Sequence, residues 1–232
     1  MKTKESYISI HGKKTKLTDE QLIELGFEVY DTKVKEFIDI IRSGKTRKHY
    51  SANDIITLCG MEFKIIGIDH DGKNTVTLMG CELLKPRRMN NGGCENGWAE
   101  TELREWLHEY FENEFPSELY EYVKEITKIT HNYKGVEFET DEYLFIPSES
   151  EMFGSSIYSD YEDMERYEAF YNSETRRLKD EDGDYCWYWL RSQVGESWSG
   201  HSTNFCYVSS NGAATNNGAS ASYRVPLCFT LS

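Results

Sequence analysis

The sequence predicts an α+β fold with antiparallel sheets and two helices. Three observations support this prediction: β-branched runs over residues 55–80, helically spaced apolar residues over 103–111, and short strand-like runs between turns over 187–231. Strands followed by helices and again by strands are typical of an α+β domain whose chain ends meet in one sheet. With 232 residues, 38% of them hydrophobic, the chain can bury one large core.

The first fifty residues predict a small helical N-terminal arm that precedes the domain. Residues 18–21, TDEQ, fit a capping box, and Gly44 would end a second helix. That helix has the i, i+3, i+4, i+7 spacing of a one-faced helix at Val34, Phe37, Ile38 and Ile41. The basic segment 45–50 then reads as a linker, so the arm covers 1–50 and the domain 51–232.

The domain is predicted to begin with an antiparallel meander. Residues 55–59, 61–68 and 75–80 are β-branched runs, and residues 70–73 form a turn. Two helices are expected next, each from its apolar spacing. The first has a stripe at Leu103, Trp106, Leu107, Tyr110 and Phe111, and the second, after an N-cap at Ser117, has one at Leu119, Val123 and Ile126.

The second half begins with a buried strand over 143–147 and a capping box formed by Ser148 and Glu151. Residues 154–184 have weak periodicity and predict a long surface excursion, partly helical around 164–171. The rest consists of short strands and turns, with Pro226 at an edge or at a strand start.

The charge distribution excludes some classes of function. The net charge of -14 argues against a protein built to hold nucleic-acid phosphates. The acidity is central, since residues 95–185 carry 26 acidic and 8 basic groups, whereas 186–232 carry only Arg191, Glu196 and Arg224. The chain shows neither a transmembrane run nor the apolar core of a signal peptide, so we expect a cytoplasmic or virion-associated protein without membrane insertion.

Enzyme and metal signatures are weak. The six cysteines form no C-x-x-C pair and read as reduced thiols, and the histidines are far apart in sequence. The motifs of P-loops, dinucleotide-binding folds, serine hydrolases and zinc proteases do not occur. We therefore expect no metal, no cofactor and no catalytic residue. Of the tryptophans, Trp98, Trp106, Trp187 and Trp189 are expected in the core, whereas Trp198 has no apolar neighbours and is either a contact residue or a packing lid.

The C-terminal polar stretch is the most informative segment. Every residue from 209 to 222 is Ser, Asn, Gly, Ala or Thr, and aromatic and aliphatic strands lie on both sides. A scaffold would hold such a stretch at both ends, and binding surfaces use pinned loops of this composition. The alternative is a hairpin loop without a ligand. If Cys206 and Val208 face the core, Tyr207 and Ser209 face outward, while the side of Phe205 stays open.

Four segments carry a resemblance to a known family. They are WAETELREWL at 98–107, EYLFIPSESE at 142–151, YWLRS at 188–192 and FCYVSSNG at 205–212. The chain resembles, over about residues 51–232, an uncharacterised domain family of gut bacteria and their phages. That family is similar to the C-type-lectin-like fold of formylglycine-generating enzymes and of the variable proteins made by diversity-generating retroelements.

The resemblance implies a C-type-lectin-like fold. It also implies functional features that can be compared with the residues of this sequence. As the resemblance implies, such retroelements mutate adenines. An Asn codon altered at its adenines can encode the polar residues found between 201 and 223. Phe205, Cys206, Val208 and Gly212 would then be fixed scaffold positions. A formylglycine-generating oxidase would need two nearby late cysteines, whereas Cys206 and Cys228 are 22 residues apart. The triplets of calcium-dependent lectins are absent, so no calcium site is expected.

The polar stretch held at both ends predicts a non-enzymatic binding protein, and the resemblance implies that it is of phage or prophage type. The variable-type segment 197–223 would present a surface to a protein or glycan on a cell, and the arm would dock onto a larger assembly or a second subunit. An acidic intracellular protein that binds a basic partner as a nucleic-acid mimic is one alternative, and the oxidase is another. The expected ligand-binding residues are Trp198, His201, Thr203, Asn204, Tyr207, Ser209, Asn211, Thr215, Asn216, Asn217, Ser220, Ser222 and Tyr223.

Overall fold

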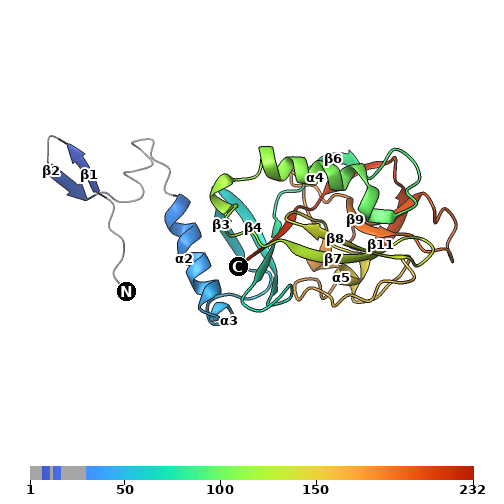
Figure 1. Cartoon of the computed structure of the whole chain (residues 1–232), viewed down its shortest axis with the longest axis horizontal. Helices are drawn as coiled ribbons and strands as arrows, with labels where there is room; N and C mark the ends of the chain where they lie inside the picture. Colours follow the sequence, from blue (N-terminus) through green and yellow to red (C-terminus); the bar gives the residue numbers. More distant parts are fainter. Residues whose placement is uncertain (1–6, 11–12, 17–29) are drawn as a thin grey trace.

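The computed structural model describes residues 7–10, 13–16 and 30–232, with side chains from residue 33 onward (Figure 1). The capping box expected at 18–21 lies outside these residues. The strands are β1 Tyr7–Ile10, β2 Lys13–Lys16, β3 Ile55–Leu58, β4 Met61–Ile68, β5 Val76–Gly80, β6 Leu84–Arg88, β7 Ile126–His131, β8 Glu137–Glu142, β9 Tyr188–Gln193, β10 Asn204–Val208, β11 Ala214–Gly218, β12 Ser222–Val225 and β13 Cys228–Leu231. The α-helices are α2 Tyr30–Arg42, α3 Thr46–His49, α4 Glu102–Asn113 and α5 Glu149–Phe153, and single 3-10 turns are η1 Gly97–Glu100, η2 Ser117–Leu119 and η3 Glu174–Arg176.

The predicted α+β class and the mostly antiparallel sheets are confirmed. Of the two helices expected in the domain, α4 forms and the second does not. The other α-helices of the described residues are α2 and α3 in the N-terminal region and the short α5 after Ser148. Within the arm that was expected to be helical, β1 and β2 pair as antiparallel strands. The segment expected to be a linker carries α3, whose Thr46 is buried.

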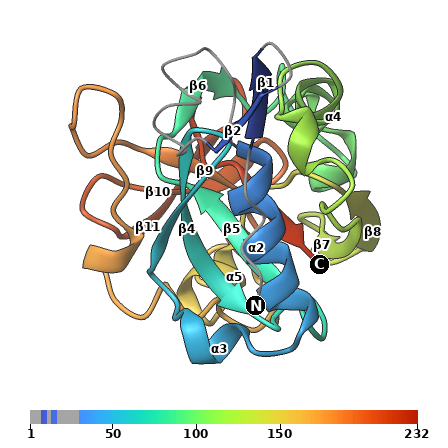
Figure 2. The same cartoon turned by 90° about the vertical axis from the view of Figure 1, so that its left-hand side faces the viewer.

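Helix α2 forms where its apolar spacing predicts it and ends at Arg42, two residues before Gly44, which adopts a φ of 67°. Its residues Val34, Phe37, Ile38 and Ile41 belong to the same hydrophobic cluster as residues of β4 and β5. Figure 2 shows α2 lying in front of these strands. The helix therefore packs on the core of the domain.

The first sheet has the strand order β13-β5-β4-β3. Strands β3, β4 and β5 form the predicted antiparallel meander, and β13 pairs antiparallel with β5, with Phe229 opposite Leu78. The prediction that the two ends of the domain meet in one sheet is confirmed. Pro226 lies between β12 and β13, outside any strand.

The second sheet has the order β11-β10-β9-β12-β6 and is antiparallel except where β12 meets β9. Each face of β10 is buried in a different hydrophobic cluster. Phe205 and Tyr207 belong to the cluster that contains α2, whereas Cys206 and Val208 belong to the second cluster. Phe205, whose side the sequence left open, is fully buried.

Two elements differ from the predictions. The helix expected after Ser117 is the short turn η2, and Ile126 begins β7, which pairs with β8. Burial alternates along β7 with the period of a strand, so the three apolar residues at helical spacing were too few to identify a helix. The expected strand over 143–147 is reduced to one bridge between Phe145 and Cys228.

Segment 154–184 is not only a surface excursion. It contains no α-helix, and Tyr167, Ala169 and Phe170 are fully buried. The backbone N–H groups of Tyr167 and Ala169 donate to the carbonyls of Glu151 and Ile66, so this part of the segment is bonded to other elements of the fold. Helix α4, by contrast, forms as predicted after its cap at Thr101, and both hydrogen bonds of the Ser148–Glu151 capping box are present.

Candidate functional site

Four of the expected ligand-binding residues lie on one face of the second sheet. Tyr207 pairs with Thr215 and Phe205 with Asn217, and directly paired residues point to the same side. Arg224 pairs with Tyr188, so Tyr223 lies on the side of Trp189. Tyr207, Thr215, Asn217 and Tyr223 therefore share this face.

Trp187, Trp189, Tyr207 and Tyr223 pack together there, and we call this cluster the aromatic face. The ring centroid of Tyr223 lies 4.5 Å from that of Tyr207 and 4.6 Å from that of Trp189. The Trp187 ring lies 5.9 Å from Tyr207 and 5.6 Å from Tyr223. These are the separations of favourable aromatic pairs, so the cluster is rigid.

Burial divides the aromatic face into a base and a top. Trp189 is fully buried, and Tyr207 and Tyr223 are each only 9% exposed, although Tyr207 was expected to face outward and both tyrosines were expected to bind a ligand. Trp187 is 48% exposed, although the sequence placed it in the core. Its aromatic neighbours in the chain suggested a buried strand, but β9 begins one residue later. Trp187 is therefore the exposed ring of the cluster.

Polar groups border the aromatic face on the side of β11. The Asn217 Nδ2 donates to the Tyr223 hydroxyl at 2.6 Å. Thr215 is half-buried and Asn217 is exposed. Burial raises the pKa of Tyr223, which keeps its hydroxyl protonated at neutral pH. The border thus offers neutral donors and acceptors beside the indole of Trp187.

Three other expected residues lie in the loop between β9 and β10. Trp198, 42% exposed, packs edge-on against Tyr158 with the ring centroids 4.8 Å apart. His201 stacks on Tyr133 at 5.1 Å, and Thr203 is exposed. Trp198 is thus both partly packed and partly accessible, and this loop is separate from the aromatic face.

The remaining expected residues do not join either group. Asn216 pairs with Cys206 on the opposite face of the sheet, where its Oδ1 accepts from Asn204 Nδ2 at 3.0 Å. Ser209 and Asn211 hydrogen-bond within the turn before β11, and Ser220 and Ser222 are exposed near the start of β12. The thirteen expected residues therefore do not form one site.

A network of buried charges lies between the two sheets and had not been predicted from the sequence. Lys128, 1% exposed, donates to Asp71 Oδ1 at 2.7 Å, Glu151 Oε1 at 3.0 Å and the Tyr167 hydroxyl at 2.9 Å. Fully buried Arg191 pairs with Glu151 Oε2 at 2.5 Å. Despite its burial, the pKa of Glu151 is lowered, because these two cations face it.

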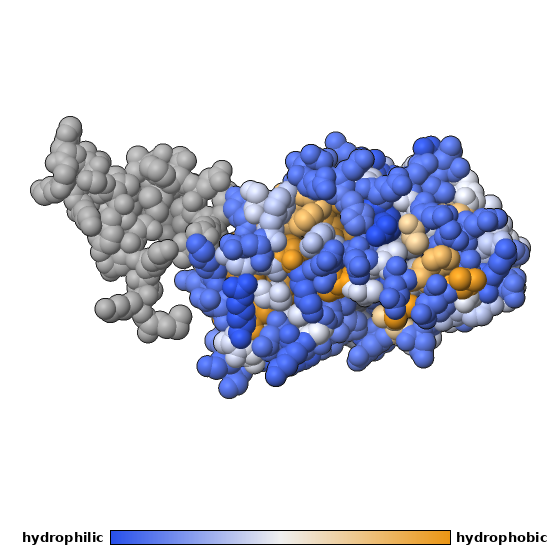
Figure 3. Space-filling view, viewed as in Figure 1, coloured by the Kyte–Doolittle hydropathy of each residue, from blue (hydrophilic) through white to orange (hydrophobic). Residues whose placement is uncertain are grey.

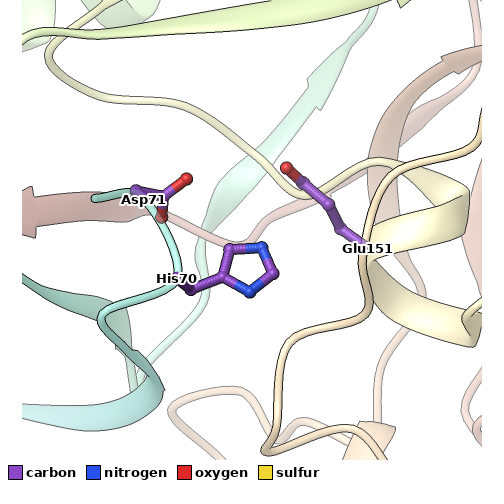
Figure 4. A group of neighbouring side chains, drawn as sticks. All are labelled: His70, Asp71 and Glu151. Carbon is purple, nitrogen blue, oxygen red and sulfur yellow. The ribbon is translucent and has the colours of Figure 1, made fainter. Parts of the chain in front are cut away.

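Part of this network has the composition of a metal site. Figure 4 shows His70 and Asp71, on the turn after β4, and Glu151, on α5, in one group, and each offers a ligand atom within 4.8 Å of the others. The Lys128 ammonium, however, donates to both carboxylates, so a positive charge already stands between them. A metal ion there would be repelled, and these residues do not fit a metal centre.

A second part of the network fixes segment 154–184. Glu149 Oε2 accepts from the backbone N–H groups of 157, 158 and 159 and from the Ser159 hydroxyl. Ser192 donates to Glu162 Oε2 at 2.5 Å. Burial raises the pKa of Glu162 to about 7. These carboxyl groups tie the segment to α5 and β9.

The two cysteines considered for an oxidase are core residues. Cys206 and Cys228 are fully buried in the second hydrophobic cluster, and all six cysteines of the chain are free thiols. Burial raises the pKa of both thiols well above the ordinary value. Both are therefore protonated and packed at neutral pH.

These features define an α+β protein whose larger, mostly antiparallel sheet has a rigid aromatic face with one exposed ring. Residues 73–232 match the family described as a domain of unknown function (DUF6273), and the chain belongs to that family. No curated protein and no solved structure matches the chain. None of the helices in the described part of the chain combines the length and apolarity needed to cross a membrane.

Proposed function

We propose that this protein is a non-enzymatic binding protein that recognises its ligand through the aromatic face and the polar residues of β11. The observation that carries the proposal is Trp187, a half-exposed indole held in place by Tyr207 and Tyr223. An ordered, exposed indole offers a large contact area and loses little conformational entropy when a ligand binds.

The polar border supplies the second requirement of recognition. Thr215 and Asn217 lie on the same face, and Asn217 is already oriented by its bond to Tyr223. Amide and hydroxyl groups beside an aromatic ring fix the orientation of a ligand that stacks on the ring. Both groups stand on β11, which is paired with β10 along its whole length, so little of the site must reorganise on binding.

The surface of the molecule is mostly hydrophilic on the face drawn in Figure 3, where apolar residues form small patches. Small patches do not resemble the large apolar surfaces of obligate subunit interfaces. A protein or glycan on a cell surface is the kind of ligand that we propose.

The finer proposal includes the C-type-lectin-like fold and diversification by a retroelement in a phage or prophage. Burial supports it: Phe205, Cys206, Val208 and Gly212, the positions expected to be fixed, are all buried. Most positions between 213 and 222 are at least partly accessible, which is the arrangement that a variable surface needs. Tyr207 and Tyr223, although reachable from Asn codons, belong to the base of the aromatic face.

The two exposed tryptophans provide the test. The full chain, Trp187→Ala and Trp198→Ala are compared for binding to an array of glycans and cell-surface proteins. We expect Trp187→Ala to weaken binding by at least tenfold, about 1.4 kcal/mol, and Trp198→Ala to bind like the wild type. Circular dichroism confirms that both variants are folded.

Two results would overturn the proposal. The first is that the wild type binds no glycan or protein of the array. The second is that Trp187→Ala binds as tightly as the wild type. A binding constant that collapses when salt is added would favour the acidic surface as the working surface and a basic partner as its ligand.

A further inference from the structure

Resting on the proposed function, we infer that the ligand of the aromatic face is an acidic saccharide, whose carboxylate or sulfate group binds Arg87. Arg87 lies in β6, next to β12 in the sheet, and pairs with Tyr223. Its carbonyl oxygen accepts the Nε1–H of Trp189 at 2.8 Å. Since paired residues point to the same side, Arg87 adjoins the aromatic face.

The guanidinium of Arg87 is oriented but carries no ion pair. It lies over the ring of Trp106, on α4, 3.9 Å from the ring centroid. Among residues 33–232, no carboxylate lies within ion-pair distance of it. The neighbouring Arg88 pairs with Glu102 at 2.7 Å, and Arg224 pairs with Asp180 and Glu181. Arg87 is exposed, so a ligand can reach this guanidinium from solvent.

There is room for a ligand group beside this arginine. A cavity of about 350 Å³ opens between β6 and α4, and its lining consists of Pro86, Arg87, Arg88, Glu102, Leu103 and Trp106. Stacking on Trp106 holds the guanidinium plane in one orientation while its N–H groups stay available. A planar guanidinium binds carboxylate and sulfate oxygens through paired, charge-assisted hydrogen bonds.

A saccharide fits these groups better than an acidic peptide does. The C–H groups of a sugar ring stack on an indole such as that of Trp187, because the face of an aromatic ring carries partial negative charge. Its hydroxyl groups match Thr215 and Asn217. An acidic peptide brings several negative charges toward a strongly acidic protein, whereas one acidic group on a sugar needs only Arg87.

The test uses saccharides in matched pairs. Each neutral oligosaccharide on an array is accompanied by the same oligosaccharide with one uronic acid or one sulfate ester, and an acidic peptide series is added. The full chain is compared with Arg87→Ala, Arg87→Lys and the control Lys85→Ala, which removes one positive charge from an exposed position of the same strand outside the cavity. Thermal unfolding confirms that each variant is folded.

We expect the wild type to prefer the acidic members, and Arg87→Ala to reduce that preference by about tenfold while binding to neutral members persists. Arg87→Lys keeps the charge but loses the planar pair of donors, so its preference for acidic saccharides should lie between those of the wild type and Arg87→Ala. Lys85→Ala leaves the preference unchanged, because Lys85 does not line the cavity. The carboxylate and sulfate arms show which acidic group is bound.

Three outcomes overturn the inference. Equal binding of neutral and acidic saccharides, or an unchanged preference in Arg87→Ala, removes Arg87 from the site and leaves the proposed function intact. Binding of acidic peptides but not of saccharides replaces the class of ligand. If Trp187→Ala and Arg87→Ala both bind like the wild type, the proposed function fails as well.

Discussion

The Tyr223 side chain extends from β12 to Asn217 on β11 and passes over Trp189 and Tyr207. In the sheet order, β10 and β9 lie between these two strands. The 2.6 Å hydrogen bond from Asn217 Nδ2 to the Tyr223 hydroxyl therefore links the edge of the sheet to its interior through side chains alone. It fixes both the aromatic base and its polar border.

Replacing Asn217 tests this link. Asn217→Ala removes the donor and leaves the mostly buried hydroxyl of Tyr223 without it, so we expect the free energy of unfolding to fall by about 1 kcal/mol. Urea unfolding measures the change. Ser220→Ala, an exposed position in the following turn, should unfold like the wild type. An Asn217→Ala protein of full stability would show that the bond contributes nothing to the fold.

Because Glu162 is buried, we expect the free energy of unfolding to decrease as the pH rises. Burial raises its pKa to about 7, above the value of 4.5 that it has when unfolded. The folded protein holds this proton more tightly, so the stabilisation is complete below about pH 4.5 and is lost as the pH rises to about 7. Above that pH the buried charge destabilises the fold by about 3 kcal/mol. The pKa values of Asp71 and Glu151 are lowered, so both stay charged throughout this range.

Glu162→Gln should therefore unfold like the wild type at pH 5 and be more stable than the wild type at pH 8.5. Urea unfolding at the two pH values gives the comparison. Glu165→Gln, an exposed position in the same segment, makes the control and should track the wild type at both. If Glu162→Gln has no advantage at pH 8.5, Glu162 does not hold its proton in the folded protein.

Gly212 and Gly183 form a pair that separates backbone strain from steric overlap. Their φ angles are 79° and 85°, so a side chain is strained at either position. A Cβ at Gly183 meets no atom within 4 Å, whereas one at Gly212 would overlap the carbonyl oxygen of Ser173. Gly183→Ala should lower the free energy of unfolding by about 1 kcal/mol.

Gly212→Ala should lower it by at least 2 kcal/mol, because the turn before β11 must also move. The carbonyls of Ser210 and Gly212 accept hydrogen bonds from Arg177 and Arg176, which would be disturbed with it. Thermal unfolding of both variants checks the difference. Equal losses would mean that the turn shifts freely away from Ser173.

Elements with local signals were predictable from the sequence. The apolar spacing of α2 and the capping box of α5 depend on residues within one or two turns, and both formed where expected. The buried charges could not be predicted, since their partners are distant in the chain. Glu151 and Arg191 are 40 residues apart, and a carboxylate in an acidic region normally faces water.

The same reason limited the prediction of the candidate site. The composition of 209–222 indicated a surface, and most of these residues are at least partly accessible. The composition did not indicate that the ring of Trp187 would contact that of Tyr223, 36 positions along the chain. Nor did it indicate that Arg87, on another strand, would pair with Tyr223. Such contacts depend on the sheet order, in which β12 and β6 are neighbours.

The pairing of β13 with β5 affects how the protein is made in the cell. Strand β5 leaves the ribosome roughly 150 residues before β13 is synthesised, a delay of about 7 to 30 s at ordinary elongation rates. During that time one edge of a strand with five buried residues lacks its final neighbour. The nascent chain thus carries an unpaired strand edge, to which other chains can bind, until translation is nearly complete. Chaperones that shield such edges should increase the yield of native protein.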